Sequence, residues 1–274
     1  MDCIMTISFN YFGNLGHLGN QMFQYAALMG LSAKHNRSFC IPPNSVFSTA
    51  DYQEDRSSIY NAFDIKPPHI GMTKFPHISE AHFHFDENLF ENPPANDFDV
   101  RGYFQSEKWF KHIEDDVRKT FTFKDKYMEV AQEMRNQVEG EVISLHIRRT
   151  DYITNVNHYC MHMGYYLKAL EIMPKEPTVI IFSDDTEWAK SQEEFPDDRF
   201  LVSETDCPYT DMALMTLCNY HINANSSYSW WGSWLANSKK VTAPSDWFSG
   251  PSSHNKLTDI YCDGWEVLNN TLGN

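Results

Sequence analysis

The sequence predicts an α/β protein with parallel, doubly wound sheets, and three features of the chain support this class. From residue 142 onward, short apolar runs of strand composition alternate with amphipathic stretches of helical period, which is typical of βαβ units. Polar residues repeatedly follow the apolar runs, as they do at the carboxyl ends of parallel strands. The chain also opens with an apolar run, a glycine-rich turn and a helical stretch, in that order.

The first half of the chain carries weaker signals than the second. A strand is expected over residues 3–9, a glycine-rich turn over 13–21 and an amphipathic helix over 21–34. Residues 42–100 are rich in Pro, Asn, Asp and His and lack periodicity, so irregular loops with short helices are expected there. The remaining expectations are a strand over 100–104 and helices over 107–121 and 124–138.

The second half is regular enough to predict each element. Strands are expected over 142–147, 178–182, 200–202, 221–224 and 241–243, and helices over 165–173, 186–191, 210–218 and 229–237. The first of these strands is apolar almost throughout, which indicates burial on both faces. The polar segment Glu139-Gly140-Glu141 precedes it, so we expect two domains, over residues 1–141 and 142–274.

Composition excludes several classes of protein. The formal net charge of -15 argues against nucleic acid as a partner, because a phosphate backbone requires a basic face. No window approaches the ~18–20 apolar residues of a membrane span. The N-terminus lacks the basic region of a signal peptide, and the six cysteines form no C-x-x-C pair. These features predict a globular protein of the reducing cytoplasm.

The loop over residues 158–162 contains a candidate metal site. His158, Cys160 and His162 alternate in a way that could ligate zinc. No fourth ligand stands at a familiar spacing, and a loop of this length is more often simply polar. The sequence therefore predicts no metal.

The segment 146–152 (HIRRTDY) is the strongest candidate for a functional site. It ends the apolar strand, and because strand side chains alternate between faces, His146 and Arg148 project to the same side. A guanidinium group beside an imidazole suits an anionic ligand, above all a phosphate. The alternative is that Arg148 and Asp151 form a structural ion pair.

Two further strand ends carry polar residues that are expected to meet this segment at the same edge of the sheet. They are Ser183, Asp184 and Asp185 after one strand, and Asn225, Ser226 and Ser227 after another. The serine hydroxyls and the free N–H groups of a helix that begins there can hold a phosphate. The alternative is an ordinary serine N-cap.

Asp211 and the tryptophans of the last predicted helix each allow two interpretations. A carboxylate such as that of Asp211 can accept two hydrogen bonds from guanine, but an acid is also favoured at a helix N-terminus by the dipole. Trp230 and Trp234 share a helical face, and packing in the core is favoured over a platform for sugars.

The glycine-rich turn before the first helix could aim backbone N–H groups at an anion. Its spacing is not G-x-G-x-x-G, and no acidic residue is placed to hold a ribose, so a dinucleotide site is disfavoured. The alternative is that the glycines only permit a tight turn.

Together these segments resemble the α-1,2-fucosyltransferase family. The resemblance is carried by residues 16–25 (GHLGNQMFQY), 146–152 (HIRRTDY), 182–185 (FSDD), 211–215 (DMALM), 225–231 (NSSYSWW), 243–244 (AP) and 247–248 (WF). They occur in order over nearly the whole chain. The first two segments are shared with more distant α-1,6- and protein O-fucosyltransferases, whereas the segment 225–231 favours the α-1,2 group.

The resemblance implies a GT-B-like fold of two Rossmann-like domains with the active site in the cleft between them. The N-terminal domain would face the acceptor and the C-terminal domain would bind the donor, GDP-β-L-fucose. The 2-hydroxyl of a terminal β-galactoside would attack the anomeric carbon with inversion. The implied partners are small molecules, and neither a cofactor nor a metal is implied.

The resemblance also assigns residues. Arg148 would bind the β-phosphate, Ser226 and Ser227 phosphate oxygens, and Asn20 would lie near the reacting centre. The donor-binding residues would be His146, Arg148, Ser183, Asp184, Asp211, Asn225, Ser226 and Ser227, and the loop facing the cleft would include Gly16, His17, Gly19 and Gln21.

The acceptor side departs from the family pattern. Thr150 stands where glycine is commoner, and Gly164 stands where an acid is usual. The first candidate for a general base is Asp151 and the second is His17. A largely dissociative mechanism that needs no strong base is the third possibility.

Three other functions are alternatives to fucose transfer. Asp97-Phe98-Asp99 is a D-x-D triplet, the signature of Mn²⁺-dependent GT-A enzymes, but it precedes a predicted strand rather than ending one. A non-catalytic glycan-binding protein would leave the phosphate-like cluster unexplained. A dinucleotide oxidoreductase would require the missing glycine fingerprint.

Overall fold

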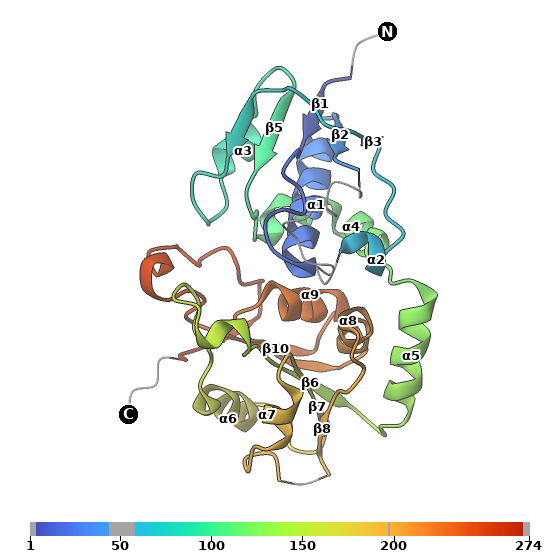
Figure 1. The fold of residues 1–274 in the computed structure, drawn as a ribbon, viewed down its shortest axis with the longest axis vertical. Helices are drawn as coiled ribbons and strands as arrows, with labels where there is room; N and C mark the ends of the chain where they lie inside the picture. Colours follow the sequence, from blue (N-terminus) through green and yellow to red (C-terminus); the bar gives the residue numbers. More distant parts are fainter. Residues whose placement is uncertain (1–3, 44–57, 197, 271–274) are drawn as a thin grey trace. The chain divides into compact units, whose positions relative to one another are not determined.

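The computed structural model describes residues 4–43, 58–196 and 198–270 (Figure 1). The chain forms two compact units. The N-terminal unit comprises Met1–Lys124 and Thr258–Ile260, and the C-terminal unit comprises Asp125–Leu257 and Tyr261–Asn274. In the described residues, no helix is long and apolar enough to cross a membrane.

The units divide earlier in the chain than the expected 141/142 boundary. The helix α5 (Asp125–Asn136) lies between the two positions, and its contacts are with α8 (Pro208–Thr216) of the C-terminal unit. The rings of Tyr127 and Tyr209 are 5.0 Å apart, and Arg135 Nε donates to the carbonyl of Leu217. The polar segment at 139–141 is therefore a turn inside the C-terminal unit.

The N-terminal unit is a parallel five-stranded sheet in the order β3-β2-β1-β5-β4. Its strands are β1 (Thr6–Ser8), β2 (Ser38–Ile41), β3 (His69–Ile70), β4 (His77–Ser79) and β5 (Phe98–Arg101). Its helices are α1 (Leu18–Lys34), α2 (Ile59–Ala62), α3 (Glu87–Glu91) and α4 (Glu114–Thr120), with 3₁₀ turns η2 (Glu107–Trp109) and η3 (Lys111–Ile113).

The sequence did not predict β2, β3 or β4, the last two of which lie where irregular loops were expected. The strand expected over 100–104 forms earlier, at β5, because Phe104 adopts a left-handed backbone with φ 54° and ends the extended run. The helix expected over 107–121 is broken at Phe110, whose φ of -137° lies outside the helical range.

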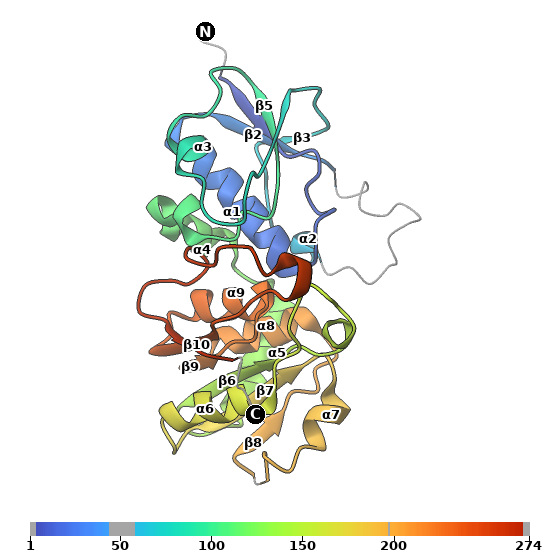
Figure 2. The same ribbon diagram turned by 90° about the vertical axis from the view of Figure 1, so that its left-hand side faces the viewer.

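The helix α1 is the central helix of the N-terminal unit. It begins at Leu18 rather than Gln21, and it is buried on most sides, as expected for a helix with few charged residues. Figure 2 shows it running alongside the sheet. Gly30 lets η2 approach closely, because a Cβ atom there would lie 1.9 Å from the carbonyl oxygen of Trp109.

The C-terminal unit is a parallel six-stranded sheet in the order β11-β10-β9-β6-β7-β8. Its strands are β6 (Val142–Ile147), β7 (Thr178–Ser183), β8 (Phe200–Val202), β9 (Tyr220–Ile222), β10 (Lys240–Pro244) and β11 (Glu266–Leu268). The helices besides α5 and α8 are α6 (Met163–Ile172), α7 (Thr186–Lys190) and α9 (Ser227–Ala236), with 3₁₀ turns η4 (Asp151–Ile153) and η5 (Gly250–Ser252). Every strand predicted after residue 141 is present, and β11 was not predicted.

The strand order reverses at β6, which positions the site. From β6 the chain moves outward through β7 and β8, and then returns to β9 on the other side of β6. Right-handed crossovers therefore place α6 and α7 on one face of the sheet and α8 and α9 on the other, as Figure 1 shows. Ligands of open parallel sheets bind at such a reversal, outside the carboxyl ends of the strands.

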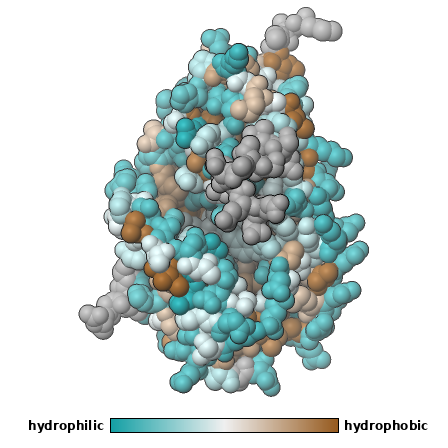
Figure 3. All heavy atoms as spheres, in the orientation of Figure 1, coloured by the Kyte–Doolittle hydropathy of each residue, from teal (hydrophilic) through white to brown (hydrophobic). Residues whose placement is uncertain are grey.

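The large aromatic side chains mostly form the core. Trp230 is fully buried and Trp234 is 4% exposed, and their rings stack with centroids 6.1 Å apart. This confirms the prediction that they pack in the core rather than forming a platform for sugars. On the face shown in Figure 3, hydrophilic side chains predominate.

Candidate functional site

The carboxyl ends of β6, β7 and β9 bring together the polar residues that the sequence singled out. Arg148 follows β6, and its guanidinium group is bonded to carboxylates on both terminal nitrogens. Nη1 lies 3.0 Å from Asp184 Oδ2, and Nη2 lies 2.6 Å from Asp151 Oδ1. The Arg148 side chain is 27% exposed, and its Cζ atom lies 5.5 Å from the centroid of the Tyr152 ring. The structure thus contains the predicted ion pair and leaves the cation partly open to a ligand.

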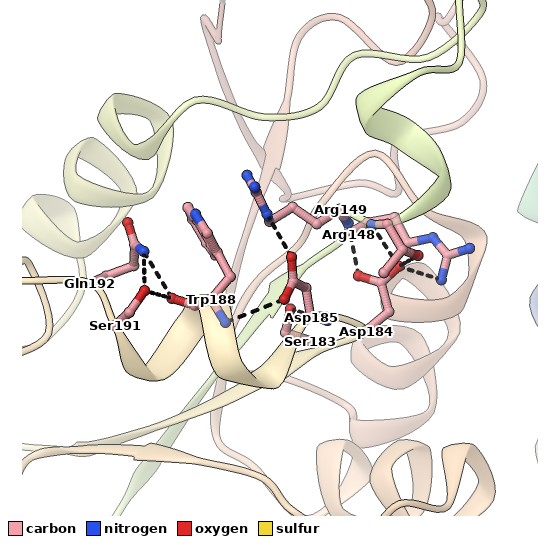
Figure 4. Close-up of polar contacts among 9 residues, drawn as sticks. Arg148, Arg149, Ser183, Asp184, Asp185, Trp188, Ser191 and Gln192 are labelled. Carbon is pink, nitrogen blue, oxygen red and sulfur yellow. Dashed lines mark hydrogen bonds and ion pairs between the residues drawn. The ribbon is translucent and has the colours of Figure 1, made fainter.

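Asp184 organises the backbone of the segment that carries this arginine. Its Oδ1 accepts the N–H of Arg149 at 2.8 Å, and its Oδ2 accepts the N–H of Thr150 at 3.1 Å (Figure 4). Its Oδ2 also accepts the Thr150 hydroxyl. Because one carboxylate holds both the loop backbone and the Arg148 side chain, it fixes where the guanidinium points.

Asp185 and Arg149 form a neighbouring pair on the other side of the strand end. Arg149 Nε lies 3.0 Å from Asp185 Oδ2, and the guanidinium stacks 4.0 Å above the Trp188 ring. Asp185 also caps α7, because its Oδ1 accepts the backbone N–H of Trp188. Ser183, a predicted donor-binding residue, accepts the N–H of Asp185 through its hydroxyl. In Figure 4 the carboxylates of Asp184 and Asp185 lie apart, the first against Arg148 and the second against Arg149.

His146, near the end of β6, is a buried and neutral imidazole. It is 5% exposed, and its Nδ1 has no hydrogen-bond partner in the described part of the chain. Burial lowers the pKa of His146 to about 3, with the Asp184 charge opposing this and the Arg148 charge reinforcing it. The Tyr228 ring lies 5.4 Å away. A neutral imidazole contributes no charge to an anion, so any contact with a ligand has to be a hydrogen bond.

Acid should destabilise the protein through its buried histidines. Burial also lowers the pKa of His221 to about 3, and its Nε2 lacks a partner among the described residues. Between pH 3 and the ordinary value of 6.5 the unfolded chain therefore binds more protons, so the free energy of unfolding should rise with pH. His221→Asn should reduce that slope by up to about 1.4 kcal/mol per pH unit, measured by urea unfolding at pH 5 to 7.

An unchanged slope in His221→Asn would show that this imidazole does not resist protonation.

The segment after β9 is held firmly by the fold. Asn225 is fully buried, and its Nδ2 donates to the carbonyls of Tyr159 and Trp247 at 3.0 and 2.9 Å. Ser226 caps α9, because its Oγ accepts the N–H of Tyr228 at 3.3 Å. Ser227 is the first residue of that helix and is half-buried. Ser226 is thus an N-cap, and a direct ligand contact of Asn225, Ser226 or Ser227 stays a prediction.

Asp211 lies in the first turn of α8 and is already bonded to hydroxyls. Its Oδ1 accepts Ser203 Oγ at 2.5 Å and Thr205 Oγ1 at 2.8 Å. Burial raises the pKa of this carboxyl, and the two hydroxyls oppose the rise. One oxygen is thus used by the protein, so the predicted double hydrogen bond to guanine would have to form around these contacts.

The glycine-rich turn of the N-terminal unit encloses Asn20. Gly16 has φ 83°, and a Cβ atom there would lie 1.9 Å from Asn20 Nδ2. Gln105 Nε2 donates to Asn20 Oδ1 at 2.7 Å. The Asn20 carboxamide is therefore contacted at both ends, which agrees with the view that the glycine is needed for the turn.

Gly16→Ala should displace Asn20. The substitution combines a left-handed backbone, which L residues disfavour, with the close contact described above. We expect a loss of ~1–3 kcal/mol in the free energy of unfolding, measured by chemical denaturation. Gly164→Ala, where a Cβ atom meets nothing within 4 Å, should cost much less and serves as the control. Equal losses would show that the turn tolerates a side chain.

The other residues of this loop mainly support structure. Gln21 is buried, and its Oε1 accepts the N–H of Ile59 at 3.1 Å, which anchors α2. His17 is the exposed N-cap residue of α1, without a side-chain capping bond, and Gly19 is buried in the first turn. A role of these residues toward a ligand stays a prediction.

The D-x-D triplet has a structural role. Asp97 Oδ1 accepts the N–H of Thr6, and Asp99 Oδ1 accepts both Ser8 Oγ and the N–H of Asn10. Both carboxylates thus hold β1 beside β5. His158, one of the three residues that could ligate zinc, stacks on Tyr152 with ring centroids 4.7 Å apart.

Three residues of these arrangements were not singled out from the sequence. They are Arg149, Tyr152 as the group behind Arg148, and Gln105. The first two lie inside the HIRRTDY segment, so their position could have indicated them. Gln105 follows β5 without any motif, and only the folded chain brings it to Asn20.

Comparison with known proteins places the chain in a family. Residues 6–269 match glycosyl transferase family 11. Among its relatives, the Escherichia coli O-antigen biosynthesis glycosyltransferase WbnK is 29% identical, with 91% of this chain and 97% of the relative covered. An Escherichia coli alpha-1,2-colitosyltransferase is 28% identical (85% and 90% covered), and the Bos taurus galactoside 2-alpha-L-fucosyltransferase SEC1 is 25% identical (82% and 64% covered).

Solved structures share the fold. NodZ alpha-1,6-fucosyltransferase soaked with GDP-fucose superimposes with a TM-score of 0.56 at 12% identity, with 87% of this chain and 94% of that chain covered. POFUT1 in complex with GDP-fucose gives a TM-score of 0.50 at 12% identity, with 97% and 98% covered.

The two parallel-sheet units have the GT-B-like α/β fold that the sequence predicts, and an active site between the units stays a prediction. The family match covers nearly the whole chain and shows that the protein is a glycosyltransferase. The chain belongs to glycosyl transferase family 11, the family of the α-1,2-fucosyltransferases, which confirms the resemblance seen in the sequence.

Proposed function

We propose that the enzyme transfers L-fucose from GDP-β-L-fucose to the 2-hydroxyl of a terminal β-galactose, with inversion at the anomeric carbon. The observation that carries the proposal is Arg148 at the reversal of the strand order, half-buried and oriented by Asp184. The activities of two relatives support it, since one is a galactoside 2-alpha-L-fucosyltransferase and another an alpha-1,2-colitosyltransferase.

The proposed role of Arg148 follows from the charge of the leaving group. As the bond to fucose breaks, negative charge develops on the diphosphate of GDP, and a fixed cation stabilises that charge more than it stabilises the bound substrate. The backbone N–H groups at the start of α9, with the hydroxyl of Ser227, would add donors to the phosphate oxygens. Asp211 and His146 would contact the nucleotide, and no step of the proposal requires a metal.

Two residues are candidates for the general base that accepts the proton of the attacking hydroxyl. Asp151 is the first candidate because its carboxylate is 52% exposed, but it is ion-paired to Arg148. It could accept a proton from the acceptor hydroxyl only after the diphosphate replaces it on the guanidinium. His17, exposed at the start of α1, is the second candidate. In a dissociative transition state the hydroxyl could also lose its proton late, without a strong base.

The test is GDP release from GDP-fucose with lactose as acceptor, in EDTA, with the product linkage read by NMR. An α-1,2-fucosylated galactose is the expected product. GDP release without a fucosylated lactose would support GDP-fucose as the donor and show that lactose is not the acceptor. GDP-colitose should be run beside GDP-fucose, and a higher kcat/KM with it would keep the linkage and correct the donor sugar. Failure to bind GDP would refute the proposal.

A further inference from the structure

We propose that Gln105 is a positioning residue for Asn20, and that its hydrogen bond fixes the orientation of the Asn20 carboxamide. The inference rests on the proposed function, in which Asn20 lies near the reacting centre. It concerns contacts within the N-terminal unit alone.

The carboxamide of Asn20 has two ends of opposite hydrogen-bonding character. Gln105 Nε2 donates to Asn20 Oδ1 at 2.7 Å, while Asn20 Nδ2 lies on the side of Gly16, where a Cβ atom would be 1.9 Å from it. The oxygen is thus bound by Gln105, and the NH₂ group lies toward Gly16. A flip of Asn20 by 180° would bring its NH₂ group against the NH₂ group of Gln105.

The backbone before Gln105 is held in an unusual conformation that fixes this glutamine. Phe104 has φ 54°, and its ring is 2% exposed, packed 5.2 Å from the ring of Trp109. Glu80 stabilises the bend, because its carboxylate accepts the N–H of Tyr103 at 2.8 Å and of Phe104 at 3.0 Å. A non-glycine residue in this region is costly and persists where the surroundings require it.

Gln105 is poorly explained by stability alone. It is 6% exposed, and its Oε1 is buried without a partner in the described part of the chain. An unsatisfied buried acceptor is unfavourable, and an apolar residue of similar shape would avoid that cost. Among the described residues, the one hydrogen bond of this side chain is the bond to Asn20, so positioning of Asn20 accounts for a glutamine here.

The test compares Gln105→Met with Asn20→Ala and the double variant. Gln105→Met keeps the volume and removes the donor, so it should lower kcat about tenfold, while the Kd for GDP and the melting temperature stay near wild type. Asn20→Ala should lower kcat further. In the double variant the loss should equal that of Asn20→Ala, because Gln105 acts through Asn20.

Gln105→Glu adds a variant that reverses the bond. An ionised glutamate can only accept, so it should draw the NH₂ group of Asn20 toward itself and lower kcat at least as much as Gln105→Met. Additive losses in the double variant would overturn the proposal. So would a full explanation of the Gln105→Met loss by a lower melting temperature.

An NMR measurement separates this proposal from the proposed function. In protein with ¹⁵N-labelled asparagine, the side-chain resonances missing from Asn20→Ala identify Asn20. Those resonances should shift or broaden in Gln105→Met, and unchanged resonances would overturn the positioning role. Absence of fucose transfer by the wild-type enzyme would instead refute the proposed function and leave this readout intact.

Discussion

Arg148→Ala is expected to lower kcat for fucose transfer by about 10²–10³-fold, the usual loss when one preorganised donor to a developing negative charge is removed. The guanidinium is held by Asp184 and Asp151 at 3.0 and 2.6 Å, so its position is set before the donor binds. Initial rates of GDP release measure the effect. Arg148→Lys should recover only part of it, because an ammonium group lacks the planar fork of donors.

Arg149→Ala is the matched control for this prediction. Arg149 is the next residue in the chain, but it pairs with Asp185 and stacks on Trp188 instead. Its loss should reduce kcat by less than about threefold and stability by ~1 kcal/mol or less, since the pair is partly exposed. Near-wild-type turnover in Arg148→Ala would remove the main support for the donor site.

The sequence predicted the C-terminal unit well because its signals are local. The strand β6 is buried at every position and forms at the predicted residues 142–147. The strand β7 likewise carries an apolar run that is followed by polar residues. Such a pattern depends on the segment itself, and neighbouring elements need not be known.

The N-terminal unit was harder because its short strands are defined by their partners. The strand β3 spans only His69–Ile70, and it is recognisable because Cys40 and Ile41 of β2 pair with it. Two exposed residues give no periodicity to detect. The glycine-rich turn was located correctly, but the start of α1 at Leu18 was not, because His17 caps it without a side-chain bond.

The sequence predicted several residues of the site, but not all of the hydrogen bonds that hold them in place. Polar residues at strand ends indicated that Arg148, Asp151 and Asp184 would meet, and they do. The sequence could not show that Asp184 holds the backbone of the arginine segment, or that Asn225 turns its amide inward toward Trp247. These hydrogen bonds join residues that are far apart in the sequence, so the alternation of side chains along one strand does not predict them.

Asp184→Asn is expected to produce the second large loss. The variant keeps one accepting oxygen but removes the charge opposite Arg148, and its NH₂ group would face a backbone N–H of Arg149 or Thr150. Breaking a fully buried pair costs ~3–5 kcal/mol, and Asp184 is 19% exposed, so a smaller effect applies. We expect kcat/KM for GDP-fucose to fall about 10- to 100-fold, with a lower free energy of unfolding, from initial rates and urea denaturation.

Asp185→Asn separates this effect from the mere presence of a carboxylate at the strand end. Asparagine caps helices as well as aspartate, so the bond to the N–H of Trp188 can persist, and only the ion pair with Arg149 is lost. Its kcat/KM should stay within about twofold of wild type, because the lost pair is partly exposed and does not involve Arg148. If the two variants lost equal activity, the orientation of Arg148 by Asp184 would not be what the reaction requires. A loss confined to Asp184→Asn would show that catalysis depends on how this one carboxylate holds the arginine.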